Sequence, residues 1–306
     1  MVASPAKASL IGFLNIHKPK GITAHDVVAK VRRILKMKHV GHGGTLDPMA
    51  TGVLPIGLNK ACRLFQFMNG DKTYKAEILL GLRTTTDDVE GEIVEELPVQ
   101  VTEDQVKTAL KEFIGTIEQI PPAYSAIHYQ GKRLYALARS GKLPSDIPKR
   151  TVTIYKMDLL SVELPVLTLR ISVSAGTYIR SIARDLGESL SCGGCLKSLL
   201  RENAGSFALK NSITLEELEN FVSQDKLEEA IIRPQDALPM PQITISDNDI
   251  QKVCQGQSLV LSEDLSASQE QRVLMTSNDK LIAIGRKIDG TRLQPEVVLA
   301  DATKTI

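Results

Sequence analysis

The N-terminal part of the sequence contains a short apolar run, followed by apolar residues at the spacing of an amphipathic helix. Residues 11–16 form an apolar run typical of a buried strand, and the sequence Lys-Pro-Lys-Gly at 18–21 predicts a turn after it. Thr23 precedes a helical pattern and has Asp26 three positions after it, which predicts a capped helix. The apolar positions of this helix are Val27, Val28, Val31, Ile34 and Leu35. Because its other face carries lysines and arginines, we expect that face to be basic.

The same two patterns recur further along the chain. Runs with the composition of strands occupy residues 74–80, 151–162 and 167–174. Helical spacing predicts one helix from Thr102 to Gly115 and another after Gly176, whose apolar positions are Ile179, Ile182, Ala183, Leu186 and Leu190. Since strands and helices do not alternate regularly, we predict a mixed α/β (α+β) sheet and not a doubly wound one.

Two segments mark the domain organisation. Residues 121–150 are rich in proline, glycine, tyrosine and basic residues, and they predict a long surface insertion with one short helix at 134–139. Residues 234–241 hold three prolines and predict a linker. We therefore expect a main domain over 9–233 and a small β domain over 242–303. Within the small domain, the patterns predict a helix at 247–254 and strands at 272–276, 281–286 and 295–300.

Composition is that of an ordinary globular protein. The chain has 306 residues, of which 42% are hydrophobic and 24% charged. No apolar run approaches 18 residues, the run at 10–14 is too short for a signal peptide, and four cysteines make no disulfide scaffold. These features predict a cytoplasmic protein with no membrane contact.

Charge is distributed unevenly along the chain. The formal net charge is +1, yet residues 1–63 carry ten lysines and arginines against two acidic residues. A local contact with a polyanion explains this asymmetry, and so does cancellation of charge between segments that are close in space. Charge alone does not separate the two explanations.

Residues 40–55, with the sequence VGHGGTLDPMATGVLP, are the most informative segment. Four glycines around an Asp-Pro pair are incompatible with a regular helix or strand, so we expect a tight, rigid loop that carries Asp47. This residue can form an Asx turn ahead of Pro48. It can equally act as a covalent nucleophile, a role that requires neither a metal nor a second acid.

Other familiar chemistries lack their motifs. The sequence contains no P-loop, no Gly-x-Ser-x-Gly elbow and no zinc-deaminase signature. Cys192 and Cys195 have the spacing of two metal ligands, but no second pair accompanies them, which disfavours a structural metal. We therefore expect neither a metal nor a cofactor.

Four motifs follow one another along the chain. Residues 15–21 read NIHKPKG and residues 41–52 read GHGGTLDPMATG. They are followed by TYKA at 73–76 with GLRTTTDDVEG at 81–91, and by SAGTYIRSIARDLG at 174–187. In this order they resemble the motifs of the bacterial tRNA pseudouridine synthases of the TruB family, and the resemblance spans residues 11 to about 210. The segment 295–300 is similar, more weakly, to the family's small C-terminal RNA-binding barrel.

The resemblance implies an isomerase that converts uridine-55 in the T loop of tRNA to pseudouridine without a cofactor. It also implies a pseudouridine-synthase-type mixed sheet as the catalytic domain and a PUA-like β-barrel at the C-terminus. The implied partner is the T stem-loop of tRNA, with no protein partner and a monomeric chain. Two alternatives are an RNA-binding or tRNA-folding module with secondary chemistry, and an RNA-guided relative that modifies ribosomal RNA in a multi-protein particle. The absence of a long basic tail disfavours the latter.

The resemblance further assigns roles to residues. Asp47 is the nucleophile, which attacks the ribose C1′ or the uracil C6, and Arg180 pairs with it and holds it ionised. Tyr74 stacks on the base and is the candidate for moving the C5 proton, although a phenol is a weak base at neutral pH. His42 stacks in the space that the flipped uridine leaves. The other substrate-binding residues implied are Tyr178, Leu199, Lys18 and Asp88.

Nine basic residues are expected to bind the RNA backbone, contacts that position RNA without reading its sequence. They are Lys30, Arg32, Arg33, Lys36, Lys38, Lys132, Arg133, Lys149 and Arg150. The sequence departs from the family pattern at Ala24 and Gly43, and also at residues 200–203, Leu-Arg-Glu-Asn, where the family usually has two arginines and a threonine. The last departure puts a phosphate contact beside Leu199 in doubt.

Overall fold

A mixed sheet forms the centre of the computed structural model, which describes residues 10–125, 127–144, 146–261, 271–289 and 291–300. Within these residues the sheet has nine strands, namely β1 (Gly12–Lys18), β2 (Val40–His42), β3 (Thr51–Leu58), β4 (Lys72–Leu80), β7 (Gly115–Gln119), β10 (Arg150–Glu163), β11 (Val166–Val173), β12 (Gly194–Ala204) and β13 (Phe207–Ala208). The main path runs β1-β3-β12-β4-β11-β10-β7, while β2 pairs with β3 and β13 with β12. The pairing of β12 with β3 is parallel and that of the other neighbours antiparallel, which confirms the predicted mixed sheet.

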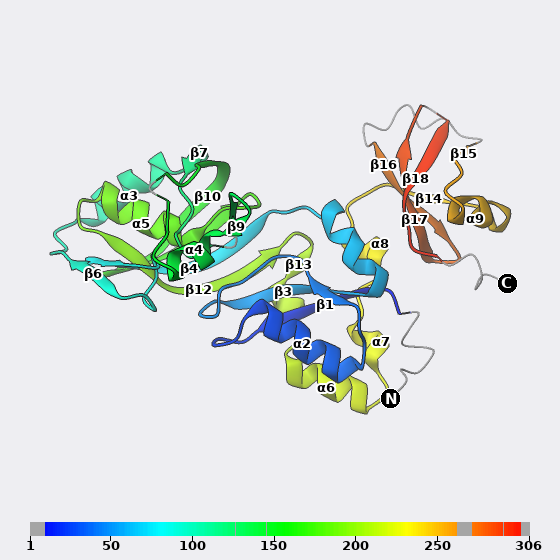
Figure 1. Cartoon of the computed structure of the whole chain (residues 1–306), viewed down its shortest axis with the longest axis horizontal. Coiled ribbons are helices and arrows are strands. Elements are labelled where there is room, and N and C mark those ends of the chain that lie inside the picture. The colour runs from blue at the N-terminus through cyan, green and yellow to red at the C-terminus, as the bar shows by residue number, and fades with distance from the viewer. Residues whose placement is uncertain (1–9, 126, 145, 262–270, 290, 301–306) are drawn as a thin grey trace.

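Helices pack against the sheet in two groups (Figure 1). One group lies beside β1 and β3 and contains α2 (Ala24–Leu35), α6 (Leu215–Ser223) and α7 (Leu227–Ala230). The other covers β4, β11 and β12 and contains α3 (Glu103–Glu112) and α5 (Ile179–Ser189). Among the described residues, the 3₁₀ helix η1 (Asn59–Phe67) connects β3 to β4, and η2 (Leu209–Asn211) connects β13 to α6. The predicted cap of α2 is confirmed, because Thr23 and Asp26 form a reciprocal capping box.

The glycine-rich segment is only partly a loop. Strand β2 enters it and β3 begins at Thr51, so the expectation that residues 40–55 contain no regular strand is wrong at both ends. Gly52 explains the difference, since it has a φ of 101° and lies directly against the backbone of β12. A Cβ atom at Gly52 would overlap the carbonyl oxygen of Arg201 and lie 2.9 Å from its backbone nitrogen. Here glycine permits two strands to approach closely, and the true loop is limited to residues 43–50.

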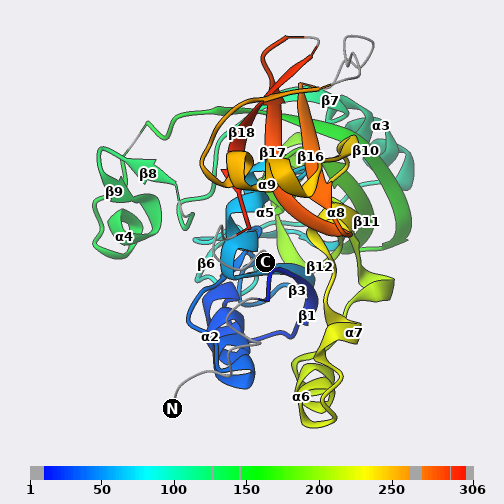
Figure 2. The same cartoon turned by 90° about the vertical axis from the view of Figure 1, so that its right-hand side faces the viewer.

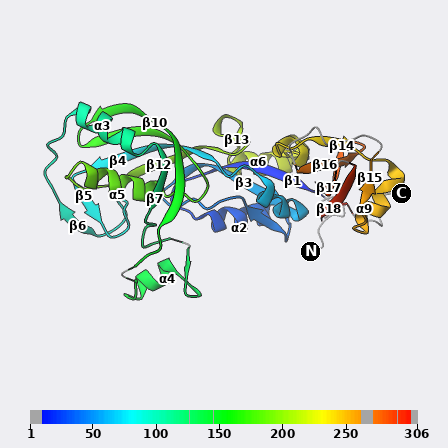
Figure 3. The ribbon, with the colours of Figure 1, turned by 90° about the horizontal axis from the view of Figure 1, so that it is seen from above.

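The predicted insertion stands away from the main sheet, as Figures 2 and 3 both show. It contains the hairpin β8 (His128–Tyr129) and β9 (Lys132–Arg133), followed by α4 (Leu134–Arg139), which matches the predicted short helix. A second hairpin, β5 (Leu82–Thr84) and β6 (Ile93–Glu96), follows β4.

The C-terminal part is a five-stranded sheet in the order β14-β16-β17-β18-β15 within the described residues. Its elements are β14 (Gln242–Thr244), α9 (Asp247–Cys254), β15 (Leu259–Val260), β16 (Arg272–Ser277), β17 (Lys280–Lys287) and β18 (Arg292–Val298). In the part of the chain that the structure describes, β14 and β15 do not pair, so the sheet is a curled half-barrel and not a closed barrel. The predicted strand at 295–300 starts earlier, at Arg292, and ends at Val298.

The predicted linker is a packed connection. Residues 234–241 contain α8 (Pro234–Ala237), and the side chains of Ala237 and Leu238 are buried. They belong to one apolar cluster that joins Phe13 of the main sheet to Ile284 of the C-terminal sheet. The predicted domain limits at residues 9 and 303 lie outside the described residues.

In the described part of the chain, no helix is both long and apolar enough to cross a membrane.

Gly187, in the last turn of α5, provides a test of the packing. An alanine inside a helix is normally favoured over glycine by about 1 kcal/mol. A Cβ atom at Gly187, however, would overlap the backbone of Gly193 and Gly194. We therefore expect Gly187→Ala to lower the free energy of unfolding by about 1–3 kcal/mol in urea unfolding. The exposed Ser189→Ala in the same turn is the control, with a change within about 0.5 kcal/mol. A more stable Gly187→Ala protein would contradict the close packing.

Candidate active site

The loop of residues 43–50 is held by two buried cationic side chains. Nζ of Lys18 donates hydrogen bonds to the carbonyl oxygens of Ala50 at 2.6 Å, Pro19 at 2.9 Å and Pro48 at 3.2 Å. The guanidinium of Arg201 donates to the carbonyl oxygens of three other residues in or beside the loop, Gly44, Thr45 and Val53. Both cationic side chains have an exposed fraction of 0%. Asp47 therefore projects from a backbone that is fixed on both sides.

Asp47 forms an ion pair with Arg180, as the sequence led us to expect. Nε of Arg180 lies 3.0 Å from Oδ2 of Asp47. This contact is an ion pair, because its geometry is not that of a hydrogen bond. The Arg180 side chain is 6% exposed and that of Asp47 is 35% exposed. The acid is thus the member of the pair that a substrate can reach.

The remaining nitrogens of Arg180 are held by groups far away in the sequence. Nη1 donates to the carbonyl oxygen of Thr86 and Nη2 to that of Tyr124, each at 3.0 Å. Nη1 also lies 3.6 Å from Oδ2 of Asp88. The carboxylate of Asp88 is in turn held by the hydroxyl of Thr86 and the backbone N–H of Glu90. These contacts leave Nε as the part of the guanidinium that faces Asp47.

Apolar and aromatic side chains surround the acid. Tyr74 and Leu199 are buried in the same cluster as Leu46 and Met49, the loop residues on either side of Asp47. Tyr178 is half-buried beside them, and its backbone N–H and carbonyl are both bound by the side-chain amide of Gln119, at 2.8 and 3.1 Å. Burial raises the pKa of the Tyr178 hydroxyl, so this group stays neutral at physiological pH. The structure thus pairs Asp47 with Arg180, places Tyr178 within range of both charges, and buries Tyr74 and Leu199 in the apolar cluster that contains Leu46 and Met49.

His42 lies at the start of the loop, in contact with α2. Its ring meets that of His25 edge to face, with the ring centroids 5.3 Å apart. Its Nδ1 accepts the backbone N–H of Gly44 at 3.4 Å. Burial lowers the pKa of His42, and the charges of His25 and Arg201 lower it further. A neutral, uncharged ring is suited to stacking on bases.

Two residues that were expected to bind substrate lie behind the site. Lys18 is fully buried under the loop, and burial lowers its pKa to about 8 although the charge of Asp47 acts in the opposite direction. Asp88 is 5% exposed and supports Arg180. Their contacts with the loop and with Arg180 are observed, whereas direct contact with substrate stays a prediction.

The nine predicted backbone-binding residues are all exposed. Arg32 uses one nitrogen to bind the carbonyl oxygen of Val40 at 2.8 Å. Lys30 and Arg33 line a groove of about 340 Å³ together with Glu216 and Glu219 of α6. Arg150 lies beside Gly176, close enough for its charge to act on the Tyr178 hydroxyl, and so connects the insertion to the site.

The sequence interpretation missed the residues that hold the site together. Arg201 lies in the segment where a phosphate contact was in doubt. It is fully buried and binds the loop of residues 43–50, so it is not available to a phosphate. Glu202 pairs with Arg170 at 2.8 Å. Gln119 was missed as well, because a single polar residue at the end of a strand carries no signal of its long-range partner. Arg201 carried no clear signal either, because Glu202 stands beside it in the sequence.

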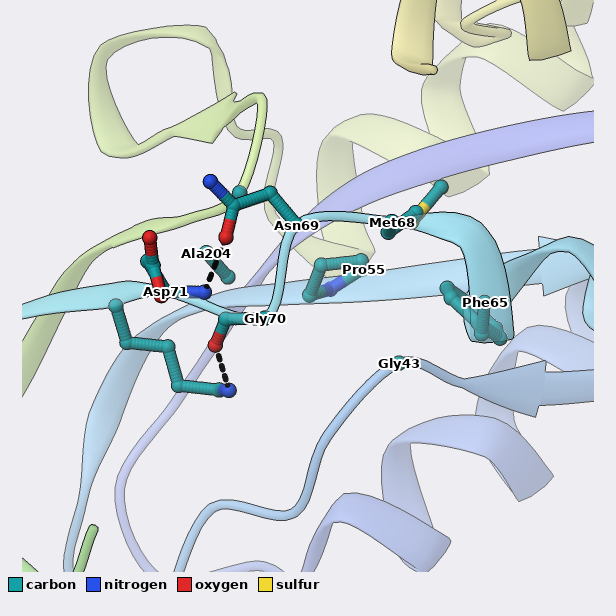
Figure 4. Close-up of a pocket in the computed structure, with 10 residues that line it drawn as sticks. Gly43, Pro55, Phe65, Met68, Asn69, Gly70, Asp71 and Ala204 are labelled. Atoms are coloured by element: carbon teal, nitrogen blue, oxygen red, sulfur yellow. Dashed lines mark hydrogen bonds between the residues drawn. The ribbon is translucent and has the colours of Figure 1, made fainter. Parts of the chain in front are cut away.

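A small cavity lies beside Gly43, the first residue of the loop (Figure 4). Its volume is about 50 Å³, which is enough for water molecules but too small for a nucleoside. Lys72 lines it and donates to the carbonyl oxygen of Gly70 at 2.5 Å, and burial lowers its pKa to about 8. Asp71, also in the lining, donates its backbone N–H to Asn69. The cavity is therefore too small to hold a base together with its ribose.

Metal ligands do not gather in the described part of the chain, where no group of three or more His, Cys, Asp or Glu side chains is placed to hold an ion. Cys192 and Cys195 are both buried free cysteines.

Comparison with known proteins gives matches over nearly the whole chain. Residues 32–179 match the model of the N-terminal domain of the TruB family pseudouridylate synthases. Residues 180–238 match the model of the tRNA pseudouridylate synthase B C-terminal domain, and residues 241–299 match the model of the C-terminal part of pseudouridine synthase II TruB. The chain is 44% identical to tRNA pseudouridine synthase B of Trichormus variabilis, a match that covers 94% of this chain and 98% of that protein. Its identity to the protein of the same name from Gloeothece citriformis is 46%, over 95% and 98% of the two chains.

Solved structures show the same fold. A chain from the crystal structure of a Cbf5-Nop10-Gar1 complex superposes with a TM-score of 0.74 at 28% identity, covering 99% of this chain and 89% of that one. A chain from an H/ACA RNP bound to a substrate RNA that contains 2′-deoxyuridine gives 0.73 at 27% identity, covering 98% and 88%.

The lowered pKa of His42 predicts a pH dependence of stability. Below about pH 6.5, the usual pKa of histidine, the unfolded chain takes up a proton that the folded protein binds less readily. The free energy of unfolding is therefore expected to fall as the pH decreases from about 7 through the folded-state pKa of His42. This loss should be smaller in His42→Gln, as measured by urea unfolding between pH 8 and 5. Identical pH profiles for the two proteins would show that His42 is not the group responsible.

Proposed function

Because the chain belongs to the TruB family of pseudouridylate synthases, we propose that it isomerises uridine-55 in the T loop of tRNA to pseudouridine, with Asp47 as the nucleophile. The chain is a tRNA pseudouridine synthase, an isomerase. The observation that carries the proposed mechanism is the pair of Asp47 and Arg180, in which a partly exposed acid is supported by a buried guanidinium.

The reaction is balanced without an external reagent. The bond between N1 of uracil and C1′ of ribose breaks, the base turns within the site, and C5 bonds to C1′. C5 loses a proton and N1 gains one, so substrate and product have the same composition. Asp47 attacks C1′ or C6, two alternatives that both begin from an ionised carboxylate. The ion pair with Arg180 holds the carboxylate in position for this attack.

The surrounding side chains suit a flipped pyrimidine. The base would stack on Tyr74 between Leu199 and Tyr178, in a site from which the neighbouring apolar residues exclude water. Tyr74 is also the candidate for moving the C5 proton. A uridine in a folded T loop must leave its stack to reach Asp47, and His42 would stack in the space that it vacates.

Basic residues of α2 and of the insertion would bind the phosphates around this uridine. Arg150 lies at Gly176, where its charge acts on Tyr178, and the hairpin β8–β9 carries Lys132 and Arg133 on the projecting insertion (Figure 2). We assign residues 9–233 to the catalytic domain and 242–303 to an RNA-binding domain. All the proposed site residues come from one chain, so a monomer suffices.

The higher identity to the tRNA enzymes, 44–46% against 27–28% for chains from H/ACA complexes, favours a tRNA substrate over a guide-RNA particle.

Asp47→Asn tests the nucleophile. The amide keeps the size of the side chain but is a poor nucleophile, so we expect no detectable pseudouridine in a T-arm transcript, while RNA binding stays within a few fold of wild type. Product is measured by carbodiimide labelling without added metal or cofactor.

Two controls accompany this variant. Asp71→Asn removes another acid near the loop, one that accepts a hydrogen bond from the Tyr155 hydroxyl, and it should keep turnover. A transcript with cytidine at position 55 should give no product. Normal turnover by Asp47→Asn would show that another group attacks, and a wild-type protein that binds the transcript without product would indicate an RNA-binding module.

The salt dependence of binding tests the insertion. If Lys132 and Arg133 bind phosphates, their replacement by alanine should weaken T-arm binding and reduce the slope of log K against log salt by about one for each phosphate that is no longer bound. Fluorescence anisotropy at several salt concentrations measures both quantities. Lys107→Ala is the control, since that lysine pairs with Glu103 on α3. An unchanged slope in the double variant would exclude phosphate binding at the hairpin.

A further inference from the structure

Arg201 connects two separate parts of the catalytic loop. Its Nε donates to the carbonyl oxygen of Val53 at 2.7 Å, its Nη2 to that of Gly44 at 3.1 Å and its Nη1 to that of Thr45 at 3.2 Å. Gly44 and Thr45 precede Asp47, whereas Val53 follows it. One rigid side chain thus fixes the backbone on both sides of the nucleophile.

The charge of Arg201 is balanced by carbonyl groups and not by an acid. The side chain is fully buried, and among the described residues no carboxylate forms an ion pair with it. Burying a guanidinium without a counterion is costly, so the three carbonyl contacts must compensate a large loss of hydration. Lysine could not reproduce them, because its ammonium is a point donor, whereas the planar guanidinium presents donors in several fixed directions.

The strand that carries Arg201 also forms other parts of the site. Arg201 is opposite Tyr74 in the antiparallel pairing of β12 with β4, and Leu199 is opposite Ala76 on the same two strands. On its other side, Arg201 is opposite Gly52 in the parallel pairing with β3. The Arg201 side chain and strand β12 together set the position of the loop relative to Tyr74 and Leu199.

We propose that Arg201 is a positioning residue for the isomerisation, which holds the carboxylate of Asp47 at its place between Arg180 and the substrate. The proposal rests on the proposed role of Asp47 as nucleophile. Arg201 touches neither the substrate nor the reacting atoms, and it acts through the loop backbone alone. Its removal therefore affects the rate of the chemical step and leaves the affinity for RNA unchanged.

The charge of Arg201 also affects titratable side chains around the loop. Burial is the main cause of the lowered pKa of Lys18, Lys72 and His42, and the charge of Arg201 lowers the pKa of each further.

The test compares Arg201→Lys, which keeps a positive charge but loses the planar fork, with Arg170→Lys. Arg170 is the matched control, because it lies on β11 of the same sheet and makes a two-point contact with Glu202 away from the loop. Single-turnover rates on the T-arm transcript and dissociation constants are measured per folded protein, with the folded fraction read by circular dichroism. We expect Arg201→Lys to lose about 100-fold in rate, since small misplacements of reacting groups have effects of this size, with the dissociation constant within threefold. Arg170→Lys should keep the wild-type rate.

Amide hydrogen exchange provides a second measurement that does not depend on activity. The amides of residues 44–53 should exchange at least tenfold faster in Arg201→Lys than in wild type, and at the wild-type rate in Arg170→Lys. Faster exchange in this segment, together with a slower chemical step and unchanged binding, supports the proposal.

Four results would overturn it. They are a wild-type rate in Arg201→Lys, a loss confined to binding, unchanged exchange in the loop, and failure to fold even with a stabilising osmolyte, since Arg201 would then determine folding and not the position of the loop. If the wild-type protein itself made no pseudouridine, the proposed function would fail, and the exchange measurement would still decide whether Arg201 holds the loop.

Discussion

The ion pair of Asp47 and Arg180 is the interaction on which the site depends, and other parts of the main domain hold both of its members. The Arg180 guanidinium comes from α5 and is held by the carbonyl oxygens of Thr86 and Tyr124. Asp47 comes from a loop whose backbone is bound by Lys18 of β1 and Arg201 of β12. Each member of the pair is thus fixed by segments distant in sequence. The contact of 3.0 Å is consequently a property of the whole domain and not of the glycine loop alone.

The parts of the fold that were predictable are those with local periodicity. The helix at 24–35, its cap, the short helix at 134–139 and the strands of β4, β10 and β11 all follow from spacing within a few neighbouring turns or pleats. Strand β12 was missed, because its sequence, GCLKSLLRENA, mixes lysine, arginine and glutamate with apolar residues and shows no clean alternation. Its position at the centre of the sheet results from pairing with β4 and β3, more than a hundred residues away, and no local pattern encodes such a contact.

The candidate site divides in the same way. Motif resemblance identified Asp47, Arg180 and Tyr74, since these residues lie in short, recognisable segments. The resemblance grouped Lys18 and Asp88 with the substrate-binding residues, and the structure shows that both are buried and contact the loop or Arg180. Burial depends on which strands cover a residue, and the basic character of residues 1–63 illustrates the ambiguity. One of its lysines, Lys18, lies under the loop, whereas the cationic side chains of α2 face solvent.

The insertion is connected to the reacting centre through the backbone as well as through charge. Tyr124, near its beginning, gives its carbonyl oxygen to Arg180, and Gln119, just before it, binds both backbone groups of Tyr178. At its other end Arg150 starts β10 and lies beside Gly176, immediately before the helix that carries Arg180. Both ends of the projecting segment therefore contact residues 176–180, the segment that ends at Arg180, the partner of Asp47. The exposed lysines and arginines of the insertion would bind the RNA phosphates. Because the same backbone orients Arg180, phosphate binding would also place the base at the correct position relative to Asp47.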